Sequence, residues 1–175
     1  MTSITRRHFA LLLPATVAAC GGAPQPRGPV FKSYNGPPVT QVVVYKGRRQ
    51  MYLLSGNRVL KSYGFGLGGQ PLGHKQFEGD NKTPEGMYFV DRFNPRSRYH
   101  LSVGISYPNA HDRAFAAQYG LSAGGDIMFH GLGPEGRKLV QQRTDWTAGC
   151  IAVTDAEMED IYAMLSMGVP VMIHA

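Results

Sequence analysis

Cysteine is scarce in this chain, which has only two among its 175 residues, Cys20 and Cys150. Neither belongs to a Cys-x-x-Cys pattern, and the six histidines show no His-x-x-x-His spacing, so the ligand patterns typical of zinc sites are missing. Acidic residues are also few, 12 against 18 lysines and arginines, and the basic residues are scattered rather than grouped with aromatic ones. Nucleic acid is therefore not an expected partner.

Long apolar runs are missing too, and the run at residues 10–19 is too short to span a bilayer as a permanent helix. It follows an arginine pair that resembles a twin-arginine export motif, and it ends at residues 17–20, which resemble the lipobox of bacterial lipoproteins. Residues 1–20 are therefore predicted to be an export signal, with Cys20 as the lipidation site. Gly21 in place of aspartate after the cysteine favours the outer membrane.

Residues 21–40 contain five prolines and no hydrophobic periodicity. This composition predicts a tether that holds the following domain, residues 41–175, away from the membrane. Without the two leader arginines the chain has 16 basic and 12 acidic residues, a formal charge of +4. We therefore expect an exported, periplasmic, lipid-anchored protein whose mildly cationic surface suits an anionic polymer such as the cell wall, or membrane head groups.

Glycine is abundant, with 22 residues, which favours a turn-rich β fold in a chain long enough for one domain. Apolar and β-branched runs between turn residues predict strands over 41–45, 50–54, 59–65, 87–93, 100–106, 126–130 and 169–173. The first three should form a meander of hairpins, and residues 94–99 an arginine-rich crossing. Short helices are expected over 113–119 and 136–143.

The clearest local pattern is a helix near the C-terminus. Thr154 and Glu157 form a Thr-x-x-Glu capping box. The apolar side chains at 158, 161, 162 and 165 then follow helical spacing. We expect this amphipathic helix to end before Gly168 and to be followed by a strand that Pro170 opens.

Cys150 is the candidate nucleophile. It follows the small residues Thr147, Ala148 and Gly149 and precedes an apolar segment. A nucleophilic thiol needs little neighbouring bulk, and it needs backbone N–H groups that can face an oxyanion. If Cys20 carries lipid, Cys150 is the one thiol left, and an oxidising compartment disfavours a free thiol without a use. A buried structural cysteine is the alternative interpretation.

His130 is the candidate base, because it ends a predicted buried strand at the glycine turn of Gly131. His100 is a rival, although a histidine that opens an apolar strand is more often structural. His74 and His111 lie in predicted loops, and His174 is nearly terminal.

His130-Gly131 followed by Thr147-Ala148-Gly149-Cys150 resembles the signature of the L,D-transpeptidases, the YkuD-type enzymes of peptidoglycan. Two further segments, residues 79–86 and 107–112, resemble that family as well. The resemblance extends over residues 42–173 and implies a mainly β, sandwich-like fold with short peripheral helices. The family's usual arginine two positions after the cysteine is replaced here by Ala152, as in a divergent branch.

The resemblance implies that Cys150 attacks a stem-peptide amide between an L-centre and a D-centre, so that a thioester forms. His130 would activate the thiol, as a base or within a thiolate–imidazolium pair, while the Gly131 carbonyl orients its ring. The N–H groups of Gly149 and Cys150 would form the oxyanion hole, with Thr147 as a further site residue. No metal or organic cofactor is implied.

Substrate-binding candidates are Trp146, beside the motif, Arg96 and Arg98, which would replace the missing arginine, and Tyr107. Arg92 is a further arginine of the same region, and a solvated face is the alternative for all three. The alternative functions are a hydrolase that trims stems or releases a wall-linked lipoprotein, and a non-catalytic peptidoglycan-binding lipoprotein. The residues alone do not decide between an amine and water as the acyl acceptor.

Overall fold

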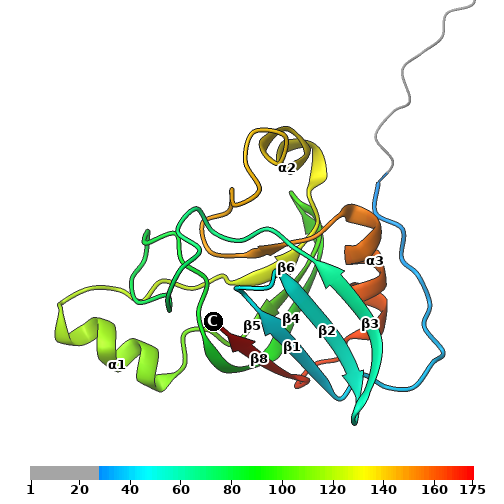
Figure 1. Ribbon diagram of the computed structural model, residues 1–175, viewed down its shortest axis with the longest axis horizontal. Coiled ribbons are helices and arrows are strands. Elements are labelled where there is room, and N and C mark those ends of the chain that lie inside the picture. The colour runs from blue at the N-terminus through cyan, green and yellow to red at the C-terminus, as the bar shows by residue number, and fades with distance from the viewer. Residues whose placement is uncertain (1–27) are drawn as a thin grey trace, which may run out of the picture.

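The structure, a computed structural model, describes residues 28–175, which form eight strands and three helices (Figure 1). The strands are β1 (Gln41–Tyr45), β2 (Gln50–Ser55), β3 (Arg58–Gly64), β4 (Gly86–Ser97), β5 (His100–Ile105), β6 (Met128–His130), β7 (Ile151–Ala152) and β8 (Pro170–His174). The helices are α1 (Ala110–Gln118), α2 (Gly133–Leu139) and α3 (Asp155–Met164). The leader and Cys20 lie outside the described residues.

The strands form one strongly bent sheet in the order β3-β2-β1-β8-β4-β5-β6-β7. The predicted meander of β1, β2 and β3 is confirmed, and all its pairs are antiparallel. Strand β8 inserts between β1 and β4, parallel to β1. Pro170 opens β8 as expected, a position where its missing N–H costs little.

Strand β4 bends the sheet into two layers. Its first part pairs with β8 and its second part with β5, and the register shifts between Val90 and Arg92. The expected crossing over residues 94–99 is wrong for its first four residues, which continue β4 to Ser97 in a hairpin with β5. Pairing with β5 overrides the turn chemistry of Asn94-Pro95. The expected mainly β, sandwich-like fold is confirmed.

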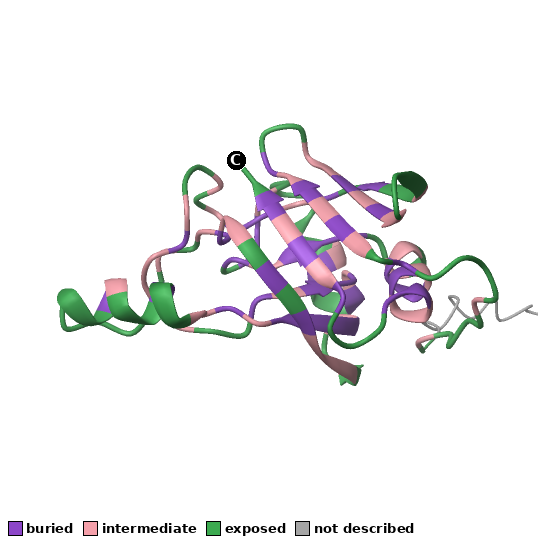
Figure 2. Ribbon diagram, turned by 90° about the horizontal axis from the view of Figure 1, so that it is seen from below, coloured by how far each residue is buried: buried purple, intermediate pink, exposed green. Residues whose placement is uncertain are grey.

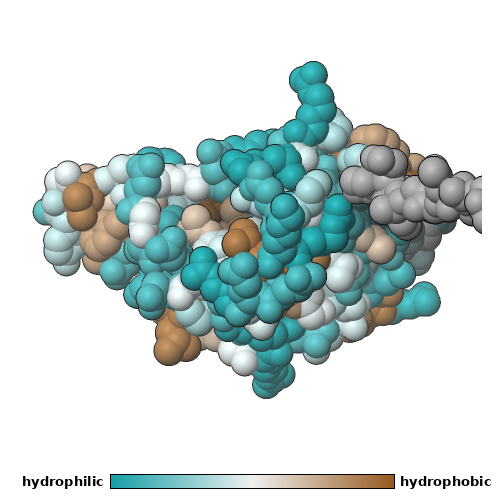
Figure 3. All heavy atoms as spheres, turned by 90° about the horizontal axis from the view of Figure 1, so that it is seen from above, coloured by the Kyte–Doolittle hydropathy of each residue, from teal (hydrophilic) through white to brown (hydrophobic). Residues whose placement is uncertain are grey.

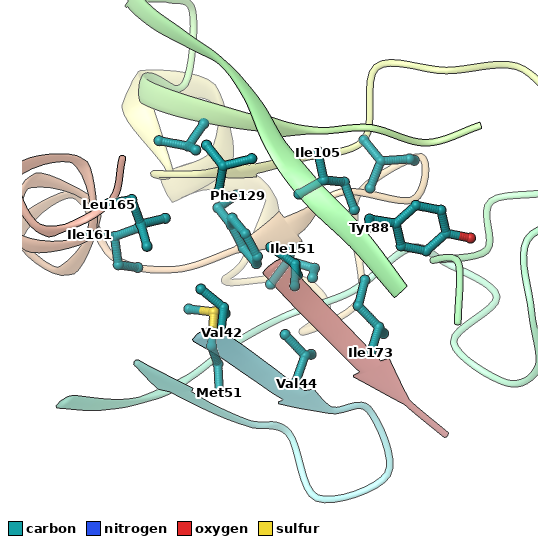
Figure 4. Packing of buried hydrophobic residues seen from close by; sticks show 14 of the residues in the cluster. Val42, Val44, Met51, Tyr88, Ile105, Phe129, Ile151, Ile161, Leu165 and Ile173 are labelled. Atoms are coloured by element: carbon teal, nitrogen blue, oxygen red, sulfur yellow. The ribbon is translucent and has the colours of Figure 1, made fainter. Parts of the chain in front are cut away.

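The core fills the space inside the bend (Figure 4). Val42 and Met51 point into it from the meander, Phe129 and Ile151 from the opposite layer, and Ile161 from α3. Each of these five side chains is at most 1% exposed. Burial of one such side chain is worth about 1.5–3 kcal/mol, so the alternating pattern of the strands accounts for the layer packing.

The C-terminal helix α3 has the predicted capping box, in which Thr154 accepts from the Glu157 N–H and Glu157 accepts from the Thr154 N–H. It packs against β5 and ends at Met164, before Gly168 as expected. Helix α2 begins at Gly133, three residues earlier than predicted, because Pro134 suits the first turn of a helix. Helix α1 begins three residues earlier than predicted and projects from the domain with mostly exposed residues (Figures 1 and 2).

Residues 28–38 run alongside α3 as an extended strap (Figure 1). The Val30 N–H donates to Glu159 Oε1 at 3.0 Å, and Lys32 Nζ lies 2.8 Å from Asp160 Oδ1. The rings of Phe31 and Tyr162 meet edge to face, with centroids 6.0 Å apart. The described end of the predicted tether is therefore attached to the domain. No helix within residues 28–175 has the length and apolar character needed to cross a membrane.

Candidate active site

The predicted base and the predicted nucleophile belong to two adjacent parallel strands. His130 is the last residue of β6, and Cys150 directly precedes β7. Phe129 pairs with Ile151 and His130 with Ala152, so Cys150 stands at the entry of β7 while His130 ends β6. Neighbouring strands lie about 4.8 Å apart and each residue advances about 3.3 Å, so Cys150 lies one strand across and two residues back from His130. The Cys150 thiol donates to the Asp126 carbonyl at 3.3 Å.

The loop before Cys150 is shaped by Thr147. Its Oγ1 accepts from the Gly149 N–H at 3.1 Å and donates to the Cys150 carbonyl at 2.7 Å. Gly149 has φ +136°, and a Cβ there would lie 2.5 Å from the carbonyl oxygen of Lys82, so only glycine fits. Of the two predicted oxyanion donors, the Gly149 N–H is thus engaged, whereas the Cys150 N–H has no acceptor among the described residues.

A glycine-rich loop supports the motif from one side. The Thr147 N–H donates to the Leu67 carbonyl at 3.1 Å, and the Gly69 N–H returns a bond to the Thr147 carbonyl at 3.0 Å. Asp145 closes this arrangement by accepting from the Leu67 N–H at 2.9 Å and from Arg49 Nη2 at 2.6 Å. The N-terminal side of the motif is therefore held by bonds from distant segments.

The segment over residues 75–86 supports the motif from the other side. Thr83 Oγ1 donates to the Gly149 carbonyl at 2.8 Å, a bond that is buried. Although burial alone would raise the pKa of Asp80, bonds from Lys75 Nζ and three backbone N–H groups hold that pKa below its usual value. Asp80 is therefore a stable anchor for this loop, and the segment shapes the site wall.

The Cys150 thiol is neutral at physiological pH. The residue is half-buried, and the burial of the sulfur raises its pKa to about 11. A hydrogen bond from the Met128 backbone lowers this pKa in part, and the negative charge of Asp126 raises it by a smaller amount. A standing thiolate–imidazolium pair, one of the two options taken from the sequence, is disfavoured.

His130 is buried, and its Nδ1 lies 2.6 Å from the Gly131 carbonyl oxygen, the contact expected from the resemblance. A carbonyl can only accept, so Nδ1 carries the hydrogen and Nε2 is the basic nitrogen of the neutral ring. Burial lowers the pKa of His130, although the bond to Gly131 opposes this in part. The ring is therefore neutral near pH 7, as a general base requires.

Two aromatic side chains hold the His130 ring. Tyr99 stacks on it with centroids 4.8 Å apart and an interplanar angle of 28°, while Trp146 meets it edge to face at 5.5 Å. Trp146 is 6% exposed and also lines a hollow beside the motif, so packing and substrate contact are both open to it. Sequence reasoning missed Tyr99, because nothing in the local sequence marks its contact with His130.

The other predicted substrate residues lie in two different settings. Arg96 and Arg98 line a hollow of about 310 Å³ that includes residues of the strap, and Arg98 is paired with Glu135. Tyr107 lies in the hydrophobic core, where its hydroxyl donates to the Ala123 carbonyl at 2.8 Å. That burial argues for a packing role of Tyr107 rather than for substrate contact.

Three further histidines, His74, His100 and His174, make structural contacts. His100 Nε2 lies 2.9 Å from Glu159 Oε1, so this rival base is a satisfied, nearly buried side chain. His74 accepts from the Glu85 N–H and lies 3.2 Å from Asp112, and His174 stacks on Tyr45. Within residues 28–175 no group of three or more His, Cys, Asp and Glu side chains is placed to hold a metal ion.

Comparisons with known proteins agree with this geometry. The model of the YkuD family, L,D-transpeptidase catalytic domain, matches residues 40–173. Over 170 residues the chain is 32% identical to the protein named "Putative L,D-transpeptidase YafK" of Escherichia coli (strain K12), an alignment covering 90% of this chain and 62% of that protein. The chain thus spans less than two thirds of this curated relative.

Solved structures share the fold. The helical cell shape determining protein Pgp2 from Campylobacter jejuni superposes with a TM-score of 0.59 at 28% identity, over 83% of this chain and 51% of that one. An L,D-transpeptidase from Mycobacterium smegmatis reaches 0.51 at 14% identity, over 77% and 58%, which is a likeness of fold alone. With the family model covering most of the sequence and both motif halves inside it, the chain belongs to the YkuD family of L,D-transpeptidase catalytic domains.

Proposed function

We propose that this protein is a cysteine-dependent L,D-transpeptidase that acts on peptidoglycan stem peptides through a thioester acyl-enzyme. The observation that carries the proposal is the placement of His130 at the end of β6 and of Cys150 directly before the adjacent strand β7, with Nε2 of a neutral, buried imidazole left as the base. A structural cysteine would need neither this neighbour nor a glycine loop built around it.

The proposed first step begins from two neutral groups. As Sγ attacks the carbonyl carbon, the thiol would turn away from the Asp126 carbonyl and pass its proton to His130 Nε2, because a thiol with a pKa of about 11 is not deprotonated beforehand. The free Cys150 N–H would donate to the developing oxyanion. The Gly149 N–H would join it only by leaving Thr147 Oγ1.

The proposed second step returns the proton. The amide C–N bond breaks, the leaving D-amino acid takes the proton from His130, and the acyl group stays on sulfur as a thioester. An amine from a second stem then attacks the thioester and loses a proton to His130, which restores the thiol. Water in place of the amine gives the alternative function, a hydrolase that trims stems or releases a wall-linked lipoprotein. A peptidoglycan-binding lipoprotein without catalysis is the remaining alternative.

Ala152 is the feature that keeps the hydrolase alternative open. Its side chain is 4% exposed in the strand beside His130, so it offers no charge to a substrate. The sequence predicts that Arg96 or Arg98 supplies the missing charge. Of these two, Arg96 has no ion pair among residues 28–175. Their hollow shares no residue with the one beside the motif.

The location of the reaction is part of the proposal. We propose export to the periplasm and lipid attachment at Cys20, with the outer membrane favoured. Because stem peptides lie outside the inner membrane, an enzyme that acts on them must be exported. Replacement of Cys20 by serine should release the protein from the membrane fraction and remove a lipid mass. Unchanged membrane retention would contradict the anchor.

Product analysis tests the reaction. Purified protein without its leader is mixed with a disaccharide tetrapeptide and an acceptor amine, and the products are identified by mass spectrometry. We expect a cross-linked product and free D-amino acid. A tripeptide alone would indicate the hydrolase. Cys150→Ala should give neither product. Turnover by that variant, or the absence of any product from the wild type, would contradict the proposal.

A further inference from the structure

A hollow of about 230 Å³ lies directly beside the motif, and it differs from the arginine-rich hollow near the strap. Thr147 and Ala148 form one wall, so it adjoins the loop that leads to Cys150. Gln70, Asn81 and Arg143 complete its polar lining. The hollow therefore combines one cationic side chain with two amides next to the reacting group.

Arg143 is a free positive charge at this hollow. It makes no ion pair with any residue that the structure describes. The nearest acidic residue in sequence, Asp145, is already bonded to Arg49 and to the Leu67 N–H, so it is not available to neutralise the guanidinium. A guanidinium with open donors binds carboxylates in preference to neutral groups.

The rim of the hollow is held in place without covering Arg143. Gln70 N–H donates to the Asn81 carbonyl at 3.0 Å, which ties the glycine loop to the neighbouring segment. A Cβ at Gly69 would lie 4.0 Å from Arg143 Nη1, an ordinary van der Waals distance, so the guanidinium lies directly beside the glycine loop. The arginine thus faces a space with a defined rim.

We infer that Arg143 binds the free C-terminal carboxylate of the donor stem, and so supplies the charge that Ala152 lacks. The inference rests on the proposed function. Only one residue separates the attacked carbonyl from that carboxylate, a span of about 3.5 Å along an extended chain. Ala148 lines the hollow and comes two residues before Cys150, a separation of at most about 7 Å along the chain, so a carboxylate one residue beyond the attacked carbonyl would lie close to the hollow. Arg143 is then a substrate-binding residue for the leaving group.

Binding measured without turnover tests the inference. In a Cys150→Ala background, calorimetry compares a tetrapeptide stem that has a free C-terminal carboxylate with the same stem as a C-terminal amide. We expect the acid to bind about ten- to a hundredfold more tightly, the size of one charge-assisted hydrogen bond. Adding Arg143→Ala should bring this ratio close to one, and Arg143→Lys should restore part of it.

Matched controls separate this site from others. Arg58→Ala removes an exposed arginine on β3, far along the sheet order from the motif, and should leave the ratio unchanged. Binding of a third stem, amidated on the diaminopimelate side chain, should still depend on Arg143. Loss of that dependence would assign Arg143 to the other carboxylate and overturn the inference, as would a full acid preference in the Arg143→Ala protein.

Failure of the Arg143 inference can be distinguished from failure of the proposed function. If the acid preference depends on Arg143 while wild-type protein forms no thioester, the carboxylate site stands and the proposed reaction falls. If the thioester forms while Arg143→Ala retains the preference, the reaction stands and the inference falls. Loss of the acid preference on substitution of Arg96 or Arg98, in place of Arg143, would also overturn the inference.

Discussion

The two halves of the bent sheet are stabilised by different interactions. The meander half, β3-β2-β1-β8, has strands of five to seven residues, and within it only the β2–β3 pairing shifts register, between Leu53 and Leu54. In the site half, β6 has three residues and β7 has two. There the loops are held by single polar side chains, such as Thr83 on the Gly149 carbonyl and Asp155 on the Leu132 N–H.

This difference indicates that one half of the sheet mainly provides stability and the other half forms the site. Apolar alternation, as at Val42 and Val44, builds the meander half and needs no individual polar residue. The site half has shorter strands at its end and more side-chain bonds, and the Cys150 N–H there has no acceptor among the described residues. Changes in the meander half should therefore alter stability, and changes in the site half should alter catalysis.

The largest expected effect distinguishes His130 from His100. His130→Gln removes the proposed base and should lower kcat about 10²–10⁴-fold, with the melting temperature little changed. His100→Gln weakens a contact with Glu159 and should cost about 1–3 kcal/mol of unfolding free energy, with kcat per folded molecule near wild type. Steady-state kinetics and urea unfolding of both variants check this. The reverse assignment of effects would make His100 the base.

A core truncation in the meander half should act on stability alone. Leu53 is 0% exposed, and Leu53→Ala should lower the unfolding free energy by about 2–5 kcal/mol. Because the site is built by other strands, kcat per folded molecule should stay the same. Urea titration with active-site labelling measures both quantities. A matching fall in kcat at full folding would break the proposed division between the halves.

A hydroxyl deletion should act more strongly in the site half. Thr83→Val leaves the Gly149 carbonyl buried without its donor, which should cost about 1–3 kcal/mol and lower kcat. The control is Thr40→Val before β1, where the exposed hydroxyl accepts from the Gly56 N–H at 2.8 Å. That change should cost less and leave kcat unaltered. Equal effects of the two substitutions on kcat would count against a loop held by Thr83.

The pH dependence should show the smallest effect. His130 must be neutral to act, and its pKa is lowered from the ordinary value of 6.5, so kcat/KM should fall only at pH below 6.5. The unfolded chain binds that proton more readily, so the stability contributed by the depressed pKa is present above about pH 6.5 and lost as pH falls towards the folded pKa. Alkylation of Cys150 should accelerate up to about pH 11. A midpoint near the ordinary thiol value would contradict a buried neutral thiol.

Much of the meander half could be predicted from the sequence. The strand at 41–45 matches β1 at both ends, and the capping box at Thr154 and Glu157 is present, because both patterns are local. The two motif halves also come to adjacent strands. The extension of β4 through Pro95 was not predicted, since pairing with β5 decides it.

The support of the site could not be predicted from the sequence. The stacking of Tyr99 on His130 and the bond from Thr83 to Gly149 join positions that are far apart in the chain. The bond from the Gly149 N–H to Thr147 Oγ1 is local, but it accompanies a positive φ at Gly149 where the Lys82 carbonyl approaches closely. Such contacts are consequences of the assembled fold.

Intact mass of the wild-type protein, quenched soon after mixing with a tetrapeptide stem, tests the central claim most directly. The account predicts an added mass equal to the stem without its terminal D-amino acid, located on the peptide that contains Cys150 and released by hydroxylamine as expected for a thioester. Cys150→Ser at matched folding should accumulate no such species. An unmodified wild-type protein during turnover, or an adduct on any other residue, would contradict the account.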